Sequence, residues 1–323
     1  MSKPHNGNLQ LVVSVVMPAY NAARTLSVAV NSVFAQTYNN LELIICNDAS
    51  SDSTTDILSS ITDPRVKVIH NETNLGEGPA RDRAIQQASG AWIAVIDADD
   101  AWHPDRLAVL TQDANPSEDV MIFDDILECH DTPSGMVPWR ALRGKYAFGG
   151  NGSDIVSVPV RDFIISDRLL IKPLMPARLI HRRIVHTNRK FGADTEFFLR
   201  LMAAGARLRY VPRAMYHYRI TPGSASGNIE RLVLMREVLE NALSQFKHDV
   251  DTQDSLRRKI AAVRRDEAYM PFVWALRKKQ MLRAIRLALR SPWVIPEFLR
   301  RSTRSLIYHL HRLRHGGRSR GIH

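Results

Sequence analysis

Short apolar runs alternate with amphipathic segments through the first half of the chain. Four apolar runs have the length of buried strands, and they lie at 11–17, 41–46, 66–69 and 92–96. Between and after them, segments with helical spacing cover 25–36, end at 58, end at 88, and cover 104–112. Strands that alternate with helices predict an α/β fold with a mostly parallel sheet and helices on both faces. We expect Gly90 to end the third helix as its left-handed terminal residue.

The pattern becomes less regular beyond the apolar run at 120–123. Residues 130–160 are rich in Gly, Pro and Ser, which predicts loops over the sheet. A helix is expected over 194–202 with its end at Gly205, and a strand over 208–211. Beyond Asn228 the sequence is helical and basic.

Charge separates the chain into two parts. From Leu256 onward there are 18 Lys and Arg residues and three acidic ones, whereas the whole chain carries +11. The preceding part is therefore mildly acidic. We expect a disordered N-terminus at 1–10, an α/β domain at 11–225 and a basic helical extension at 226–323.

Composition narrows the setting in which the protein acts. Hydrophobic residues make up 45% of the chain and charged residues 24%, as in folded soluble proteins. Cys46 and Cys129 provide neither a disulfide framework nor metal-ligand spacing. With no signal-like or membrane-spanning stretch in the sequence, we expect a cytoplasmic protein.

Three carboxylates follow the apolar run that ends at Ile96. Asp97 and Asp99 form an Asp-x-Asp pair, and two carboxylates at that spacing can share one hard cation. A divalent ion there would neutralise a diphosphate and stabilise its departure. The alternative is structural, because Asp100 and the residues after it also fit the start of a helix.

Polar clusters follow all four predicted strands. Neighbouring loops at the carboxyl edge of an α/β sheet converge on one crevice, so the clusters can form one site. In such a site Tyr20 can stack on a base, Asp48 can accept the imide hydrogen of uracil, and Arg81 can meet phosphate or base oxygens. Each residue also has a structural alternative, as a turn, a helix cap or a solvated charge. The four clusters are Pro18-Ala19-Tyr20-Asn21, Asn47-Asp48, the turn from Asn74 to Arg81, and Asp97 to Asp100.

Together, in this order, the clusters resemble the motifs of the family 2 glycosyltransferases of GT-A fold, over about residues 10–225. The resemblance implies a Rossmann-like sheet and a nucleotide-sugar donor. It places Asp48 on the base with Tyr20 beside it, Asp97 near the ribose, and Asp99 on Mg²⁺ or Mn²⁺. Pro18, Asn21 and Arg81 complete the nucleotide-sugar site that it implies.

Asp194 matches the position of the family's catalytic base, before the segment Phe197-Phe198-Leu199-Arg200-Leu201. An inverting transfer needs a carboxylate that takes the proton of the attacking hydroxyl. The alternative is an N-cap aspartate whose helix has Glu196 in its first turn. This sequence also departs from the family, with Ala193 in place of a glutamate, a short spacer at 184–191, and Thr221 where a histidine is common; His217 lies nearby.

A narrower resemblance and the basic tail suggest the acceptor. Phe123-Asp124-Asp125-Ile126 and Ile171-Lys172-Pro173 are similar to bacterial exopolysaccharide enzymes of the succinoglycan ExoO type, which implies a lipid-linked oligosaccharide acceptor. Segments 274–290 and 297–315 have one apolar and one arginine-rich face, and such helices bind anionic membrane surfaces. The alternative is that the apolar faces pack on the catalytic domain.

These observations predict an inverting, metal-dependent transferase that uses a UDP-hexose and lies on the inner face of the plasma membrane. A nucleotidyltransferase would need a phosphate loop rich in glycine and lysine after the first strand, where this chain has Pro18-Ala19-Tyr20-Asn21. A nucleic-acid partner is not expected, because the tail is mainly arginine and leucine, whereas a nucleic-acid surface would interleave its basic residues with stacking aromatics. An inactive scaffold of the same fold is a further alternative, although Asp48, Asp97, Asp99 and Asp194 are intact.

Overall fold

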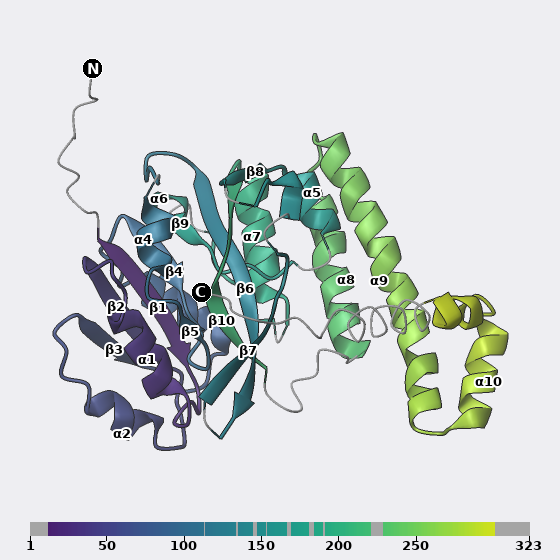
Figure 1. The fold of residues 1–323 in the computed structure, drawn as a ribbon, viewed down its shortest axis with the longest axis horizontal. Coiled ribbons are helices and arrows are strands. Elements are labelled where there is room, and N and C mark those ends of the chain that lie inside the picture. The colour runs from purple at the N-terminus through teal and green to yellow at the C-terminus, as the bar shows by residue number, and fades with distance from the viewer. Residues whose placement is uncertain are drawn as a thin grey trace, which may run out of the picture. The chain divides into compact units, whose positions relative to one another are not determined.

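The computed structural model describes residues 12–300 except 113, 134, 145, 146, 153, 167, 168, 181–183, 190 and 221–228. The predicted disorder of 1–10 therefore lies outside the described residues. The described strands form one sheet of ten strands in the order β3-β2-β1-β4-β9-β6-β10-β5, with β7 on β6 and β8 on β10 (Figure 1). The strands are β1 (Val13–Ala19), β2 (Leu41–Asn47), β3 (Val66–His70), β4 (Trp92–Val95), β5 (Ala101–Trp102), β6 (Val120–Thr132), β7 (Gly135–Ala141), β8 (Val156–Val158), β9 (Leu174–Pro176) and β10 (Arg207–Ile220).

Helices lie between the strands along the chain and also follow the last strand. They are α1 (Leu26–Phe34), α2 (Thr54–Ser59), α3 (Glu77–Ile85), α4 (Arg106–Thr111), α5 (Val160–Ile165), α6 (Ala177–Ile180), α7 (Ala193–Ala203), α8 (Ile229–Leu243), α9 (Val250–Arg277) and α10 (Met281–Arg290), with a short 3₁₀ turn at Ala147–Gly149. The predicted α/β architecture with C-terminal helices is confirmed.

Parallel pairing holds for the first part of the sheet. Strands β3, β2, β1 and β4 run parallel, as predicted from the alternation of strands and helices. Strand β9 is antiparallel to both β4 and β6, and β6 pairs in parallel with β10. The prediction of loops over 130–160 was wrong in part, because β7 forms a hairpin with β6 and β8 pairs with β10.

Strand β1 is buried on both faces. Its residues Val13, Val15 and Met17 belong to one core cluster with Leu26 and Val33 of α1. Helix α3 packs against β1 and β2, and the alternation of side chains along a strand places it on the opposite face. The apolar run seen in the sequence thus becomes a central strand covered on both faces.

Gly90 has a different role from the predicted helix end. Helix α3 ends at Ile85, and its C-cap is Gln86. The Gly90 amide donates to Ser14 Oγ at 2.8 Å, and a Cβ at this position would lie 2.5 Å from the carbonyl oxygen of Val12. The residue is small because the chain passes close to β1 here. Gly205, with φ of +100°, does end α7 as predicted.

A buried ion pair between Arg106 and Asp124 joins α4 to β6. Arg106 is 0% exposed, and its Nη2 lies 2.8 Å from Asp124 Oδ1. Arg106 also donates to the carbonyl of Lys172, and its guanidinium lies 4.6 Å from the ring centre of Trp102. Burial raises the pKa of Asp124, although the charge of Arg106 opposes that shift. Arg106 therefore holds together α4, β6 and the segment before β9.

The chain divides into two compact units. One comprises residues 1–224 and 237–259, and the other comprises 225–236 and 260–323. The second unit has its own small core, which includes Phe272, Val273 and Val294. The boundary predicted at 226 stays a prediction. No helix in the described part of the chain is both long enough and apolar enough to span a bilayer.

The predicted amphipathic segment 274–290 is two helices. Helix α9 ends at Arg277, Lys279 has a positive φ of 56°, and α10 begins at Met281. The chain reverses here because a left-handed residue stops helix propagation. Of the predicted segment 297–315, only 297–300 are described, and they are helical; the rest lies outside the described residues.

We expect Arg106→Met to destabilise the protein by about 3–5 kcal/mol, because Asp124 stays buried without its counter-ion. The loss should shrink at low pH, since a protonated Asp124 no longer needs a cation. Denaturation by guanidinium chloride at several pH values measures both effects. The control is Arg140→Met, because Arg140 is 49% exposed in its pair with Glu128, and exposed pairs contribute about 0–1 kcal/mol. Equal losses in the two variants would contradict the prediction.

Candidate functional site

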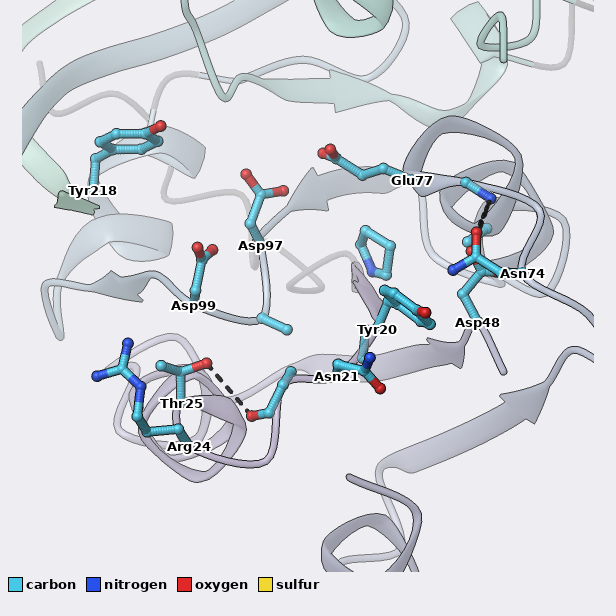
Figure 2. Close-up of a pocket in the computed structure, with 16 residues that line it drawn as sticks. Tyr20, Asn21, Arg24, Thr25, Asp48, Asn74, Glu77, Asp97, Asp99 and Tyr218 are labelled. Atoms are coloured by element: carbon cyan, nitrogen blue, oxygen red, sulfur yellow. Dashed lines mark hydrogen bonds between the residues drawn. The ribbon is translucent and has the colours of Figure 1, made fainter. Parts of the chain in front are cut away.

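A cavity of ≈ 640 Å³ opens at the carboxyl ends of β1, β2 and β4. Figure 2 shows Asp97 and Asp99 side by side on one side of the cavity and Tyr20 with Asp48 on the other. The residues that line it come from the four loops predicted to converge: Pro18, Ala19, Tyr20, Asn21, Ala22, Arg24, Thr25, Asp48, Asn74, Gly76, Glu77, Ala80, Asp97, Ala98 and Asp99, with Tyr218 from β10. Of the predicted site residues, Arg81 and Asp194 do not line it.

The loop after β1 is fixed to the loop after β2. The Asn21 amide donates to Ser50 Oγ at 3.0 Å, and the Ser51 amide donates back to Asn21 Oδ1 at 2.8 Å. Asn21 has a φ of 49°, which asparagine tolerates better than most residues. These bonds hold the backbone of Tyr20, whose side chain is 53% exposed. An aromatic ring is therefore presented to the cavity on a fixed loop.

Asp48 organises the third loop from a buried position. Its side chain is 2% exposed, and its Oδ1 accepts hydrogen bonds from Asn71 at 2.6 Å and from the Leu75 amide at 2.9 Å. Its Oδ2 accepts from the Gly76 amide at 2.8 Å. Because each carboxylate oxygen has about two acceptor positions, Asp48 keeps capacity for a donor in the cavity.

A second aspartate of this loop joins the loop after β1 to the start of α2. Asp52 Oδ1 accepts from the Thr54 amide at 3.0 Å, and its Oδ2 accepts from the Ala23 amide at 3.1 Å. The N-cap of α2 is Ser53, so neither Asp48 nor Asp52 is the capping residue. The two aspartates of this loop thus hold different neighbouring segments.

Asp100 clamps the acidic loop to β10. It is 1% exposed and accepts from the Tyr216 hydroxyl at 2.7 Å and from the Arg219 amide at 2.8 Å. The Asp97 amide donates to the same tyrosine oxygen at 3.2 Å, and Arg219 Nε donates to the Asp99 carbonyl at 2.6 Å. The proposal that Asp100 caps the next helix was wrong, because the N-cap of α4 is Asp105.

Asp99 projects into the cavity without a counter-ion. Its residue is exposed, and no ion pair found among the described residues includes its carboxylate. The protein packed around it and the negative charge of Asp97 raise the pKa of Asp99 to about 6. Arg24 is the one cation among the described residues that line the cavity, and it pairs with Asp131.

No group of three metal-ligating side chains is present among the described residues. A divalent cation at Asp99 would therefore need further oxygen ligands from a bound molecule. Mg²⁺ is commonly held in this way, by one or two carboxylates together with substrate phosphates. The exposed, unpaired carboxylate of Asp99 fits that arrangement.

Behind Asp97, two buried cations meet three carboxylates. Arg81 is 1% exposed and pairs with Glu77, with Asp97 at 2.9 Å, and with Asp194. Lys172 Nζ donates to Asp97 Oδ2 at 2.5 Å and to Asp194 Oδ2 at 3.0 Å. The guanidinium of Arg81 is engaged by these carboxylates and does not line the cavity. Its predicted contact with the nucleotide stays a prediction.

Asp194 lies in the first turn of α7, with its side chain 20% exposed. Burial disfavours its charged form, but Arg81 and Lys172 outweigh burial and hold the pKa of Asp194 well below its usual range. The N-cap alternative was wrong, because the N-cap is Gly192. Glu196 instead accepts from Thr187 Oγ1 at 2.7 Å and Arg189 Nε at 2.8 Å.

Several contributors were missed by sequence reasoning. Lys172 stood in a segment quoted for the resemblance, and a lone lysine between apolar residues was the available signal. Gly78 is also structural, because a Cβ at this position would lie 2.8 Å from the Thr187 carbonyl. His217 pairs with β5 and does not line the cavity; Thr221 lies outside the described residues.

Comparison with known proteins gives the same picture. Residues 14–149 match the family model described as "Glycosyl transferase family 2". The chain is 28% identical over 298 residues to "Succinoglycan biosynthesis protein ExoO" of Rhizobium meliloti, covering 88% of this chain and 82% of that protein. It is 44% identical over 96 residues to the β-1,3-glucosyltransferase WfgD of Escherichia coli, covering 30% of this chain and 38% of that protein.

Solved structures show the fold. S. aureus TarS 1-349 in complex with UDP superposes with a TM-score of 0.57 at 18% identity, covering 78% of this chain and 70% of that chain. The mannosyltransferase PcManGT of Pyrobaculum calidifontis, in complex with GDP-Man and Mn²⁺, gives a TM-score of 0.57 at 18% identity over 88% of this chain and 83% of that chain.

Proposed function

We propose that this chain transfers a hexose from a UDP-hexose, with inversion, to a lipid-linked glycan in polysaccharide biosynthesis; the match of residues 14–149 to the family 2 glycosyltransferase model supports this reaction class. The proposal rests mainly on one observation. The same cavity is lined by the exposed ring of Tyr20, the buried hydrogen-bond acceptor Asp48 and the unpaired carboxylate of Asp99. These are the groups that a base, its imide hydrogen and a cation-bound diphosphate require. The ExoO relative supports the pathway class.

The donor site follows from the fixed loops. Tyr20 stacks on the base, Asp48 accepts its imide hydrogen with its remaining acceptor capacity, and Asp97 receives the ribose hydroxyls. Pro18 and Asn21 shape the loop that carries the ring. UDP is the nucleotide in the TarS complex and in the printed name of WfgD, whereas PcManGT holds GDP-Man. Uracil is preferred here because Asp48 matches its single imide donor.

Asp99 would hold Mg²⁺ or Mn²⁺ together with the donor diphosphate. When bound, such an ion supplies the positive charge that stabilises the leaving diphosphate. Asp100, Tyr216 and Arg219 keep the Asp99 backbone in place, so the carboxylate meets the diphosphate without reorganisation of the loop.

Asp194 takes the proton of the acceptor hydroxyl as that hydroxyl attacks the anomeric carbon. Arg81 pairs with both Asp97 and Asp194, so the donor-side carboxylate and the base are held on one rigid group. Positioning of this kind supports direct displacement with inversion.

The acceptor side is proposed to lie at a membrane surface. In α10, Met281, Leu282, Ile285 and Leu289 are 56%, 75%, 53% and 76% exposed, and their spacing places them on one helix face. Arg286 borders this face, and Arg283 and Arg290 lie on the opposite side of α10. Such a face suits an anionic bilayer, where a polyprenyl-linked acceptor resides.

We expect Asp99→Ala to weaken Mn²⁺-dependent UDP binding about tenfold or more, since the ion loses its one protein carboxylate ligand. Calorimetric titration with UDP, with and without Mn²⁺, measures this loss. GDP is the specificity control, and Asp63→Ala is the matched aspartate control because Asp63 pairs only locally with Arg65. UDP binding that is indifferent to Mn²⁺ and to Asp99 would refute the donor assignment and favour an inactive scaffold.

Asp194→Asn should lower kcat about 10²–10⁴-fold, the range that general base catalysis contributes. UDP affinity should stay within about threefold of wild type, because Asp194 does not line the donor cavity. The assay follows hexose transfer from UDP-glucose and other UDP-hexoses to lipid-linked acceptors in bacterial membranes. An Asp194→Asn enzyme with wild-type kcat would show that another group accepts the proton.

The pair of changes Leu282→Glu and Leu289→Glu should reduce binding to phosphatidylglycerol-containing vesicles at least tenfold, because burial of each leucine contributes about 1.5–3 kcal/mol. Vesicle co-sedimentation measures the bound fraction, and vesicles of phosphatidylcholine alone test the role of charge. Val250→Glu is the matched control, since Val250 is 69% exposed outside α10. Equal binding by the double variant and the control would exclude this face as the membrane contact.

A further inference from the structure

Lys172 is a buried cation that bridges the two sides of the site. Its side chain is 3% exposed, in the segment that leads into β9. Its Nζ lies 2.5 Å from Asp97 Oδ2 and 3.0 Å from Asp194 Oδ2. A buried ammonium is stable only when it is paired, and these carboxylates raise the pKa of Lys172 above its ordinary value against the effect of burial. Lys172 therefore stays charged.

The two partners of Lys172 belong to different parts of the proposed reaction. Asp97 lines the donor cavity, and Asp194 does not. Arg81 joins the same two carboxylates, but it also pairs with Glu77 on its own helix. Among the described residues, Lys172 has ion pairs with Asp97 and Asp194 alone. The ammonium of Lys172 is thus held by those two carboxylates, while its backbone carbonyl accepts a hydrogen bond from Arg106.

Both oxygens of Asp194 are held by cations, one each. Arg81 donates to Oδ1 and Lys172 donates to Oδ2. Each oxygen has about two acceptor positions, so each keeps one for an incoming hydroxyl. With one cation removed, the carboxylate would be free to rotate about its Cβ–Cγ bond.

We propose that Lys172 is a positioning residue for sugar transfer, which orients the Asp194 carboxylate toward the acceptor hydroxyl and ties that orientation to the donor-side Asp97. The inference rests on the proposed function, in which Asp194 accepts the proton. Lys172 acts through these two carboxylates and touches neither substrate.

The charges around Asp194 fix the direction in which its pKa should change when Lys172 is replaced. Arg81 faces it from α3, Lys172 from the segment before β9, and His186 Nε2 lies 3.9 Å from its Oδ1. The other ring nitrogen of His186 lies 2.6 Å from Asp82 Oδ1. Removal of Lys172 takes away one of the cations that favour ionised Asp194. The group should then take up a proton at a higher pH.

The test compares Lys172→Met, Lys172→Gln and Lys172→Arg in the hexose-transfer assay with UDP-hexoses and bacterial membranes. For the two neutral variants we expect kcat to fall about tenfold or more, while KM for the UDP-hexose stays within about threefold of wild type, because Lys172 does not line the donor cavity. Lys172→Arg keeps the charge and should restore part of the lost kcat. Lys67→Met is the matched control, because Lys67 is exposed and contacts Gln87.

Two negative results are distinguishable. Folded neutral variants with wild-type kcat, beside an active wild type, would overturn the role of Lys172 and leave the proposed function intact. A wild-type protein that transfers no hexose would overturn both. Because loss of a buried cation can destabilise the fold, thermal unfolding is measured for each variant; Lys172→Gln retains a donor and serves where Lys172→Met does not fold.

Discussion

The arrangement of the site depends on the burial of one guanidinium. Arg81 is 1% exposed, and it pairs with carboxylates from its own helix, from the loop after β4 and from α7. A charge so buried is tolerated only when it is fully compensated. The three segments must therefore come together in one geometry, although Glu77, Asp97 and Asp194 are far apart in sequence. Lys172 adds a second cation to the same carboxylates.

Around this charged core, the site separates rigid supports from exposed working groups. Asp48 and Asp100 are nearly inaccessible and use their oxygens to hold loops. Tyr20 and Asp99 stand on those loops and face the cavity (Figure 2). A preorganised loop presents its ligand-binding groups with little conformational cost at the moment of binding. The proposed donor site is thus built from buried aspartates that support exposed side chains.

The basic C-terminal helices follow different physics. Their described part has a small core of its own, yet α10 leaves a row of large apolar side chains exposed. Exposed apolar rows of this kind, bordered by arginines, are typical of interfacial helices rather than of a solvated surface. The break at Lys279 separates α10, which carries this row of side chains, from α9.

Much of the first half of the protein was determined by local sequence. The runs that became β1, β2 and β4 are apolar and almost entirely buried. The residues after them are polar, so the strands and the positions of the loops could be predicted. The convergence of Tyr20, Asp48, Asp97 and Asp99 on one cavity followed from that topology. The mixed half was less readable, because antiparallel strands such as β7 and β9 are short or carry exposed polar residues.

Only the tertiary structure decided which groups the charged residues pair with. Sequence could identify Arg81, Asp100, Lys172 and Asp194 as ionisable, but not which would be buried or paired with which. Burial changes the cost of a charge by several kcal/mol, and pairing reverses that cost only at contact distance. Arg81 was therefore predicted to bind the nucleotide, but the sequence did not show that it is buried among carboxylates. Asp100 was considered as a helix cap and instead holds β10, and Lys172 had no assigned role. Periodicity along the chain predicts the elements and their edges, whereas contacts between distant residues decide the state of each ionisable group.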